Sequence, residues 1–295
     1  MLLLIEKDSA VDGSVEETKV QAEKHFLDLS YYLAIRALNL CSIPQDVQAQ
    51  VSKIWCSEYE SLENSINCLR SLFKQEFKEL YCYDLSKVWE WKESRIKFIL
   101  SRCLAICDEP SYDSFVFACA FIFHMVLYWF NERNCYQIIH ECQFCLYSLY
   151  KRKLMEIFHT LDDYEKFKSF CEDVDESLSS KIDDGKLNTA LDSLPDSGQT
   201  FFEMIERCVI ATDEDFSPTL SDLEFWGREK ETRNLNKIEG HFRNAKRNIC
   251  DVKHSSEQSV SGTSLDKVTG NQMDINDRME FLSDICEFCG GRCGM

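Results

Sequence analysis

Apolar residues recur every three or four positions from about residue 14 to about residue 174, and this spacing places them on one face of successive α-helices. The first helix is predicted to begin at Ser14, which together with Glu17 has the spacing of a capping box. Its apolar face is expected to consist of Phe26, Leu29, Leu33, Ala37 and Leu40.

A second capping-box spacing, at Ser42, opens a helical pattern that runs to about residue 82. That length is unusual for one helix, which favours a break near residues 57–61. A third helix, capped by Asp84, is expected to end before Pro110, because a residue that precedes proline disfavours the helical conformation.

The most apolar stretch is residues 114–130, SFVFACAFIFHMVLYWF, which contains no charged residue. We expect a buried central helix here, capped by Ser111 or Asp113, with His124 as a core histidine. The stretch also reaches the lower limit of about 17 residues for a membrane span, although a polar group near its middle is costly there. A membrane anchor at residues 114–130 is therefore the alternative.

Further helices are expected after a polar break at residues 131–134, and the last, a short one, ends near residue 174. Glycine marks the boundary of this helical region: of the ten glycines, only Gly13 lies before Gly185. Because glycine disfavours helix interiors, the long interval without it is typical of helices joined by short turns.

The sequence thus predicts an all-α fold of five to seven helices, arranged as an irregular helical bundle or a short helical solenoid, over residues 14–174. The hydrophobic fraction of 44% is sufficient for a core. Residues 1–13 are expected to form a flexible N-terminus. Residues 175–295 are rich in Ser, Asp, Thr, Asn and Gly, which predicts a largely disordered acidic C-terminal tail.

Short apolar islands interrupt this tail, and such islands often fold when a partner supplies a groove. Aromatic side chains contribute most per residue at interfaces, so the aromatic members of the islands are the predicted partner contacts. They are Phe201, Phe202, Phe225, Trp226 and Phe288. The alternative is that the islands dock back on the helical domain of the same chain.

The formal net charge of −18 argues against nucleic acid as the main partner, since phosphates are neutralised by basic surfaces. Residues 1–8, MLLLIEKD, lack the apolar run of about 7–15 residues of a secretory signal. Sixteen cysteines without such a signal are typical of reduced thiols in the cytoplasm or nucleus.

Cys286, Cys289 and Cys293 have a spacing that allows three thiolates to converge on zinc or an iron–sulfur cluster. A closed structural site needs a fourth ligand, for which His254 and Cys250 are candidates, and a thiol-rich flexible tail is the alternative. A second C-x-x-C pair follows His140, but it lies in a helical apolar pattern, which favours core packing over redox chemistry.

Ser217 precedes a proline and is a candidate phosphorylation site, where added charge would alter docking of a neighbouring island. The motifs of P-loop, dinucleotide-binding, α/β-hydrolase and zinc-protease sites do not occur. We therefore expect a non-catalytic scaffold or adaptor subunit of an intracellular multiprotein complex, with protein partners and no required cofactor. The alternatives are a membrane-associated protein anchored by residues 114–130, and a helical enzyme without recognisable motif that uses His124.

Overall fold

The computed structural model of the chain describes residues 9–80, 92–133, 135–182 and 197–212. Within these ranges the chain forms helices and turns and no strand, which confirms the predicted all-α class. Most of the predicted tail lies outside the described residues.

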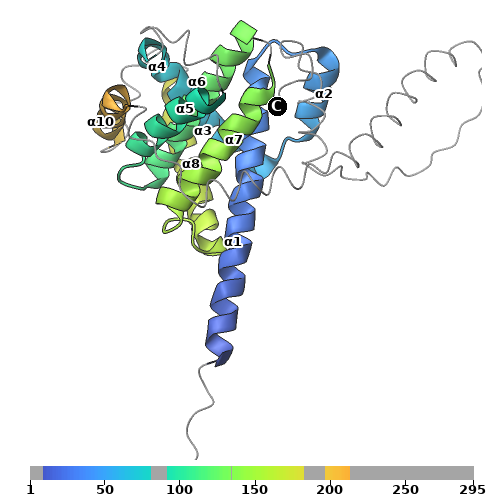
Figure 1. Cartoon of the computed structure of the whole chain (residues 1–295), viewed down its shortest axis with the longest axis vertical. Helices are drawn as coiled ribbons and strands as arrows, with labels where there is room; N and C mark the ends of the chain where they lie inside the picture. Colours follow the sequence, from blue (N-terminus) through green and yellow to red (C-terminus); the bar gives the residue numbers. More distant parts are fainter. Residues whose placement is uncertain (1–8, 81–91, 134, 183–196, 213–295) are drawn as a thin grey trace, which may run out of the picture. The chain divides into compact units, whose positions relative to one another are not determined.

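The first half of the domain contains one long helix and three shorter ones (Figure 1). They are α1 (Ser9–Arg36), which continues as a 3₁₀ turn (Ala37–Leu40), α2 (Gln45–Lys53), α3 (Glu60–Leu72) and α4 (Lys74–Glu79). A 3₁₀ turn at Ser57–Tyr59 separates α2 from α3 and confirms the break predicted near residues 57–61.

The second half contains the more apolar helices. They are α5 (Lys92–Ile106), α6 (Tyr112–Arg133), α7 (Gln137–Leu149) with a π-helical extension (Tyr150–Leu154), α8 (Leu161–Ile182) and α10 (Ser197–Ile210). The described ranges therefore hold nine α-helices, more than the five to seven expected, because residues 45–79 form three helices and α10 is added. Helix α8 continues through residue 174 without a break.

A reciprocal pair of serines opens α6. The backbone N–H of Ser114 donates to Ser111 Oγ at 3.1 Å, and the backbone N–H of Ser111 donates to Ser114 Oγ at 2.9 Å. Each side chain thus satisfies a backbone donor that the first helical turn leaves free, as in a capping box. Of the two predicted caps, Ser111 is the one that the structure shows.

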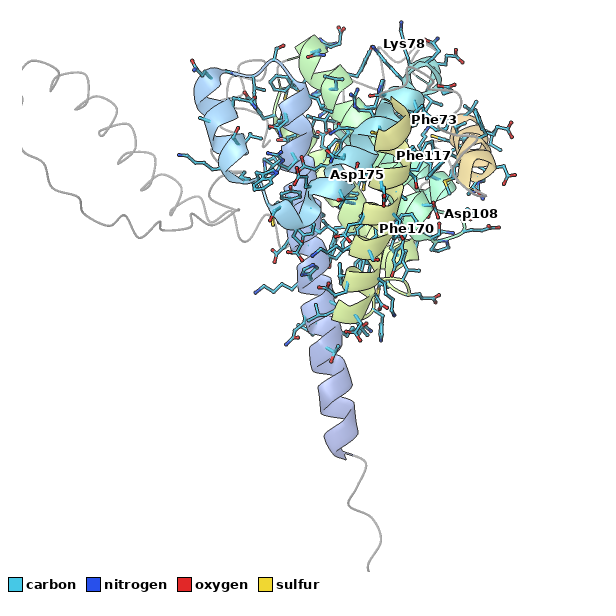
Figure 2. The ribbon with its side chains drawn as sticks, turned by 180° about the vertical axis from the view of Figure 1, so that it is seen from behind. Phe73, Lys78, Asp108, Phe117, Phe170 and Asp175 are labelled. Atoms are coloured by element: carbon cyan, nitrogen blue, oxygen red, sulfur yellow. The ribbon has the colours of Figure 1, made fainter. Side chains whose placement is uncertain are left out.

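Helix α6 lies in the core and contacts several other helices through aromatic rings. The ring of Phe115 lies 5.5 Å from that of Phe26 on α1 and 5.4 Å from that of Phe167 on α8. The ring of Phe117 lies 4.9 Å from that of Phe73, which follows α3 (Figure 2). The buried central helix predicted from the apolar stretch is therefore the element around which the described helices pack.

Length and composition alone would also allow α6 to cross a membrane, and it is the one described helix with this property. Within its most apolar window, however, 83% of the residues are buried inside the protein. Such burial is typical of a core helix, because a membrane-spanning helix presents part of its apolar surface to lipid.

Two buried ion pairs connect the helices. Arg36 on α1 donates to both carboxylate oxygens of Glu63 on α3, at 2.8 and 2.9 Å, and the Tyr32 hydroxyl donates to the same carboxylate. Arg95 on α5 donates from Nε to Glu141 on α7 at 2.7 Å and again from Nη2. A buried charge is unfavourable without a partner of opposite charge. The two pairs therefore favour the packing of α1 beside α3 and of α5 beside α7.

Candidate partner-binding site

Helix α10 is attached to the domain by one apolar face. Its buried residues have helical spacing and are Phe201, Met204, Ile205 and Cys208. The Phe201 ring lies 5.2 Å from that of Phe117 on α6 and 6.2 Å from that of Phe73. The first apolar island therefore docks back on the same chain, and Phe201, a predicted partner contact, is 1% exposed and packs in the core.

Beside this buried face, α10 leaves large apolar side chains on the surface. Phe202, Val209 and Ile210 are 43%, 57% and 76% exposed. Among the residues that the structure describes, six large apolar side chains are exposed, and these three belong to one helix. Phe202 and Val209 are seven positions apart, so they lie on the same side of α10. We call Phe202, Val209 and Ile210 the α10 apolar strip.

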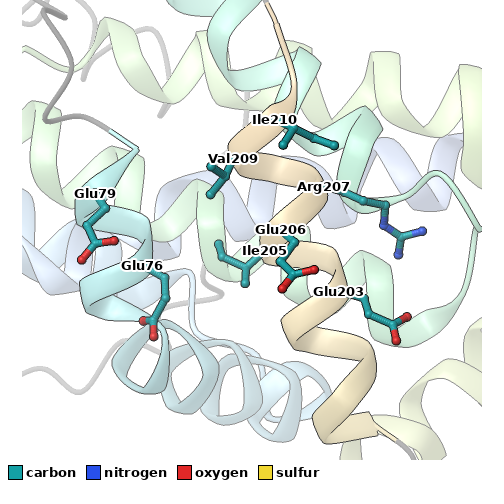
Figure 3. Close-up of a pocket in the computed structure, with 8 residues that line it drawn as sticks. All are labelled: Glu76, Glu79, Glu203, Ile205, Glu206, Arg207, Val209 and Ile210. Atoms are coloured by element: carbon teal, nitrogen blue, oxygen red, sulfur yellow. The ribbon is translucent and has the colours of Figure 1, made fainter.

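A cleft of about 600 Å³ runs between α4 and α10 beside this strip. Two of its lining residues, Glu76 and Glu79, belong to α4. The others belong to α10 and are Glu203, Ile205, Glu206, Arg207, Val209 and Ile210. Figure 3 shows Ile205 and Val209 on the side of α10 that faces α4, and Arg207 extending from the opposite side. Apolar side chains therefore lie between the two helices beside Glu76 and Glu79 of α4, whereas Glu203 extends on the same side of α10 as Arg207 (Figure 3).

The cleft is strongly acidic, since four glutamates and one arginine line it. Glu79 accepts a hydrogen bond of 3.1 Å from the Gln75 amide. Glu76 Oε2 is buried and has no hydrogen-bond donor among the described residues. A buried carboxylate oxygen without a donor is unfavourable. The exposed carboxylates of Glu79 and Glu206 are the ones that a cationic group of a partner can reach.

The sequence shows the two pairs of glutamates that line the cleft, but it does not show that the two pairs come together. Glu76 and Glu79 are three positions apart, as are Glu203 and Glu206, and this spacing places each pair on one side of its helix. The two pairs are separated by more than a hundred residues. Only the packing of α10 on the domain brings them together.

The remaining predicted site residues lie outside the described ranges, and their roles stay predictions. They are Ser217, Phe225, Trp226, Phe288, Cys286, Cys289 and Cys293, with the zinc that the three cysteines would hold. Within residues 9–80, 92–133, 135–182 and 197–212, no group of three or more His, Cys, Asp or Glu side chains is arranged to hold a metal ion.

The cysteines of the described ranges are free thiols. Cys142 and Cys145, the internal C-x-x-C pair, are both fully buried on α7. Burial raises the pKa of Cys142 well above its ordinary value, so the group remains a thiol. Since thiolates are the reactive form, this environment supports core packing rather than redox chemistry.

His124, the residue considered for catalysis, is 6% exposed on α6, and its ring lies 5.6 Å from that of Phe77. Burial, together with the positive charges of Arg70 and Lys74, lowers its pKa to about 4. The imidazole is therefore neutral at pH 7. A histidine of this kind contributes to stability only while it is uncharged.

This low pKa predicts a specific acid sensitivity. As the pH falls from about 6.5, the unfolded chain takes up a proton at His124 before the folded chain does, which destabilises the fold. The free energy of unfolding should fall by up to about 3 kcal/mol by pH 4, since one pKa unit corresponds to about 1.4 kcal/mol. Urea denaturation at several pH values measures this loss. The slope should be smaller in a His124→Gln variant, and an equal slope in both proteins would contradict the assignment.

Comparison with protein-family models, curated proteins and solved structures gives no match.

Proposed function

We propose that the chain is a non-catalytic adaptor subunit that binds protein partners in a hetero-complex. The observation that carries this proposal is the α10 apolar strip, Phe202, Val209 and Ile210, which is exposed beside the buried face of that helix. Isolated apolar side chains are common on protein surfaces, whereas a group of them is typical of an interaction site. Aromatic and aliphatic anchors of this kind supply much of the binding energy at interfaces.

Other features support the same function. Ion pairs and aromatic contacts connect the described helices, as expected of a rigid platform. The histidine and the C-x-x-C pair that were candidates for chemistry are buried. Eleven free cysteines in the described part suit a reducing compartment such as the cytoplasm or nucleus, which is part of the proposal.

The proposal predicts that the full chain co-purifies with other proteins in stoichiometric amounts. The test is affinity purification from native cells without detergent, followed by light scattering and mass spectrometry of the eluted material. A soluble hetero-complex is the expected result. A lone monomer would contradict the adaptor function, and recovery that requires detergent would support instead a membrane anchor at α6.

A further inference from the structure

We propose that the cleft between α4 and α10 binds a basic amphipathic helix of a partner protein. This inference rests on the proposed adaptor function and specifies the chemistry of the partner. The cleft offers the exposed apolar side chains of Val209 and Ile210, with acidic residues on both helices (Figure 3). A ligand that matches it must carry apolar side chains in the middle and cationic side chains beside them.

The apolar part of the partner is indicated by exposure. Val209 and Ile210 are more than half exposed at the cleft, and Phe202 continues the apolar strip along α10. Covering these side chains removes apolar surface from water, which favours binding by roughly 25 cal/mol per Å² before the costs of association. A groove between two helices suits a third helix that presents residues at i, i+3 or i+4, and i+7.

The charged part of the partner is indicated by the carboxylates. Glu76 and Glu79 line one wall, while Glu203 and Glu206 come from the opposite helix. Lys74 and Lys78 also belong to α4 but do not line the cleft. An arginine or lysine in the cleft would be attracted by Glu76 and Glu79 from α4 and by Glu206 from α10. The exposed Glu79 and Glu206 carboxylates would then accept charge-assisted hydrogen bonds, the stronger kind in proteins.

The same charges argue against other occupants. A second copy of this chain that docked through the same cleft would place one acidic cleft against another, and like charges that face each other oppose association. A nucleic acid would bring phosphates to four glutamates, which is unfavourable for the same reason. An acidic peptide would add like charges to the four glutamates, and a neutral peptide would leave their charges without a cationic partner. A cationic helix satisfies both the charge and the apolar surface.

The experiment is a selection of peptides against the full-length chain. A phage library displays random peptides of about 15 residues, roughly four helical turns. Binders are retained on the wild-type chain after counter-selection on a Glu79→Lys/Glu206→Lys variant. We expect enrichment of peptides with net positive charge and apolar residues at helical spacing. Enrichment of acidic or neutral peptides, or no enrichment over the counter-selected variant, would overturn the proposal.

A labelled peptide from this selection then serves as the probe in fluorescence anisotropy. The Glu79→Lys/Glu206→Lys variant should bind the peptide about tenfold more weakly, because two attractive charges in the cleft are replaced by repulsive ones. Raising the salt from about 0.1 M to about 1 M should weaken wild-type binding, because the Debye length shortens from about 10 Å to about 3 Å. Equal affinity of variant and wild type would overturn the assignment to the cleft.

The matched control is a Glu165→Lys/Glu172→Lys variant, which changes the net charge equally at two exposed positions of α8. Its affinity for the probe should stay within about twofold of the wild type, since exposed charges at a distance are screened. A loss as large as that of the cleft variant would show that net charge alone attracts the peptide. Circular dichroism of both variants checks that the fold is retained.

A purification from cells separates the two proposals. If Glu79→Lys/Glu206→Lys loses a partner that the wild type and the α8 control retain, both the adaptor function and the cleft assignment are supported. If the complex survives in all three proteins, the adaptor function stands and the cleft assignment fails. If even the wild type elutes alone, the adaptor function itself fails.

Discussion

Replacing Arg95 by methionine is expected to lower the free energy of unfolding by about 3 to 5 kcal/mol. Glu141 is fully buried on α7, and Arg95 on α5 donates to both of its carboxylate oxygens. The Arg95 guanidinium also lies 4.6 Å from the centre of the Trp129 ring on α6, so one side chain joins three helices. Without it, a buried negative charge loses its main compensation. Urea denaturation followed by circular dichroism measures the loss.

Two controls identify the cause of that loss. A Lys153→Met variant removes a surface ion pair with Asp108 and should cost less than about 1 kcal/mol. An Arg95→Met/Glu141→Leu double variant should recover much of the stability, since an apolar pair of similar volume often replaces a buried ion pair at little cost. If the double variant were no more stable than Arg95→Met, the uncompensated charge would not be the cause.

Replacing Phe117 by alanine is expected to cost about 3 to 5 kcal/mol and to loosen α10. Phe117 is fully buried, and its ring lies 5.4 Å from that of Phe77 and 5.2 Å from that of Phe201. The truncation leaves a cavity where α3, α4, α6 and α10 meet, so both the core and the attachment of α10 weaken. Denaturation gives the stability, and limited proteolysis in native buffer reports on α10.

The matched control for this prediction is Phe202→Ala, which removes a ring of α10 that is 43% exposed. It should cost much less, because less of the ring is buried. Faster cleavage within α10 is expected for Phe117→Ala alone. If the two variants lost equal stability, or if cleavage of α10 did not change, α10 would not depend on the α6 core.

Much of the fold was predictable because local signals agreed with the packing. The apolar stretch 114–130 has no charged residue, so its side chains are removed from water either in a protein core or in a membrane. Pro110 and Ser111 mark the start of α6, since proline limits the preceding helix and serine caps the next. Such signals act within one or two turns and need no knowledge of distant residues.

The boundary between α3 and α4 was not predictable from periodicity. Leu69, Phe73 and Phe77 are spaced four apart and are all buried, so the helical pattern continues across the break. Phe73 itself has φ −97° and ψ 21°, outside the helical range, while its ring still packs in the core. The backbone leaves the helical conformation at Phe73, but the same side chains still face the core. A pattern of apolar positions shows which side chains face the core and does not show such a change in the backbone.

Helix α10 and the cleft could not be inferred from the sequence for a different reason. The polar composition of residues 177–199 is typical of disorder, and the apolar island after it suited either a partner or the same chain. The buried spacing of Phe201, Met204 and Cys208 was present, but its counterpart, Phe73 and Phe117, lies far away in the sequence. Whether the island binds a partner or packs on its own chain depends on a long-range contact, and no local sequence signal specifies that contact.

Hydrogen exchange of the full chain, alone and in its purified complex, tests most directly the claim that partners bind at α10. Amide protection reports where a bound protein excludes water and suppresses local opening. We expect the complex to show added protection in α4 and α10, whose residues line the cleft, and little change in α8 on average. Protection that appears elsewhere while α4 and α10 exchange as in the free chain would contradict the account.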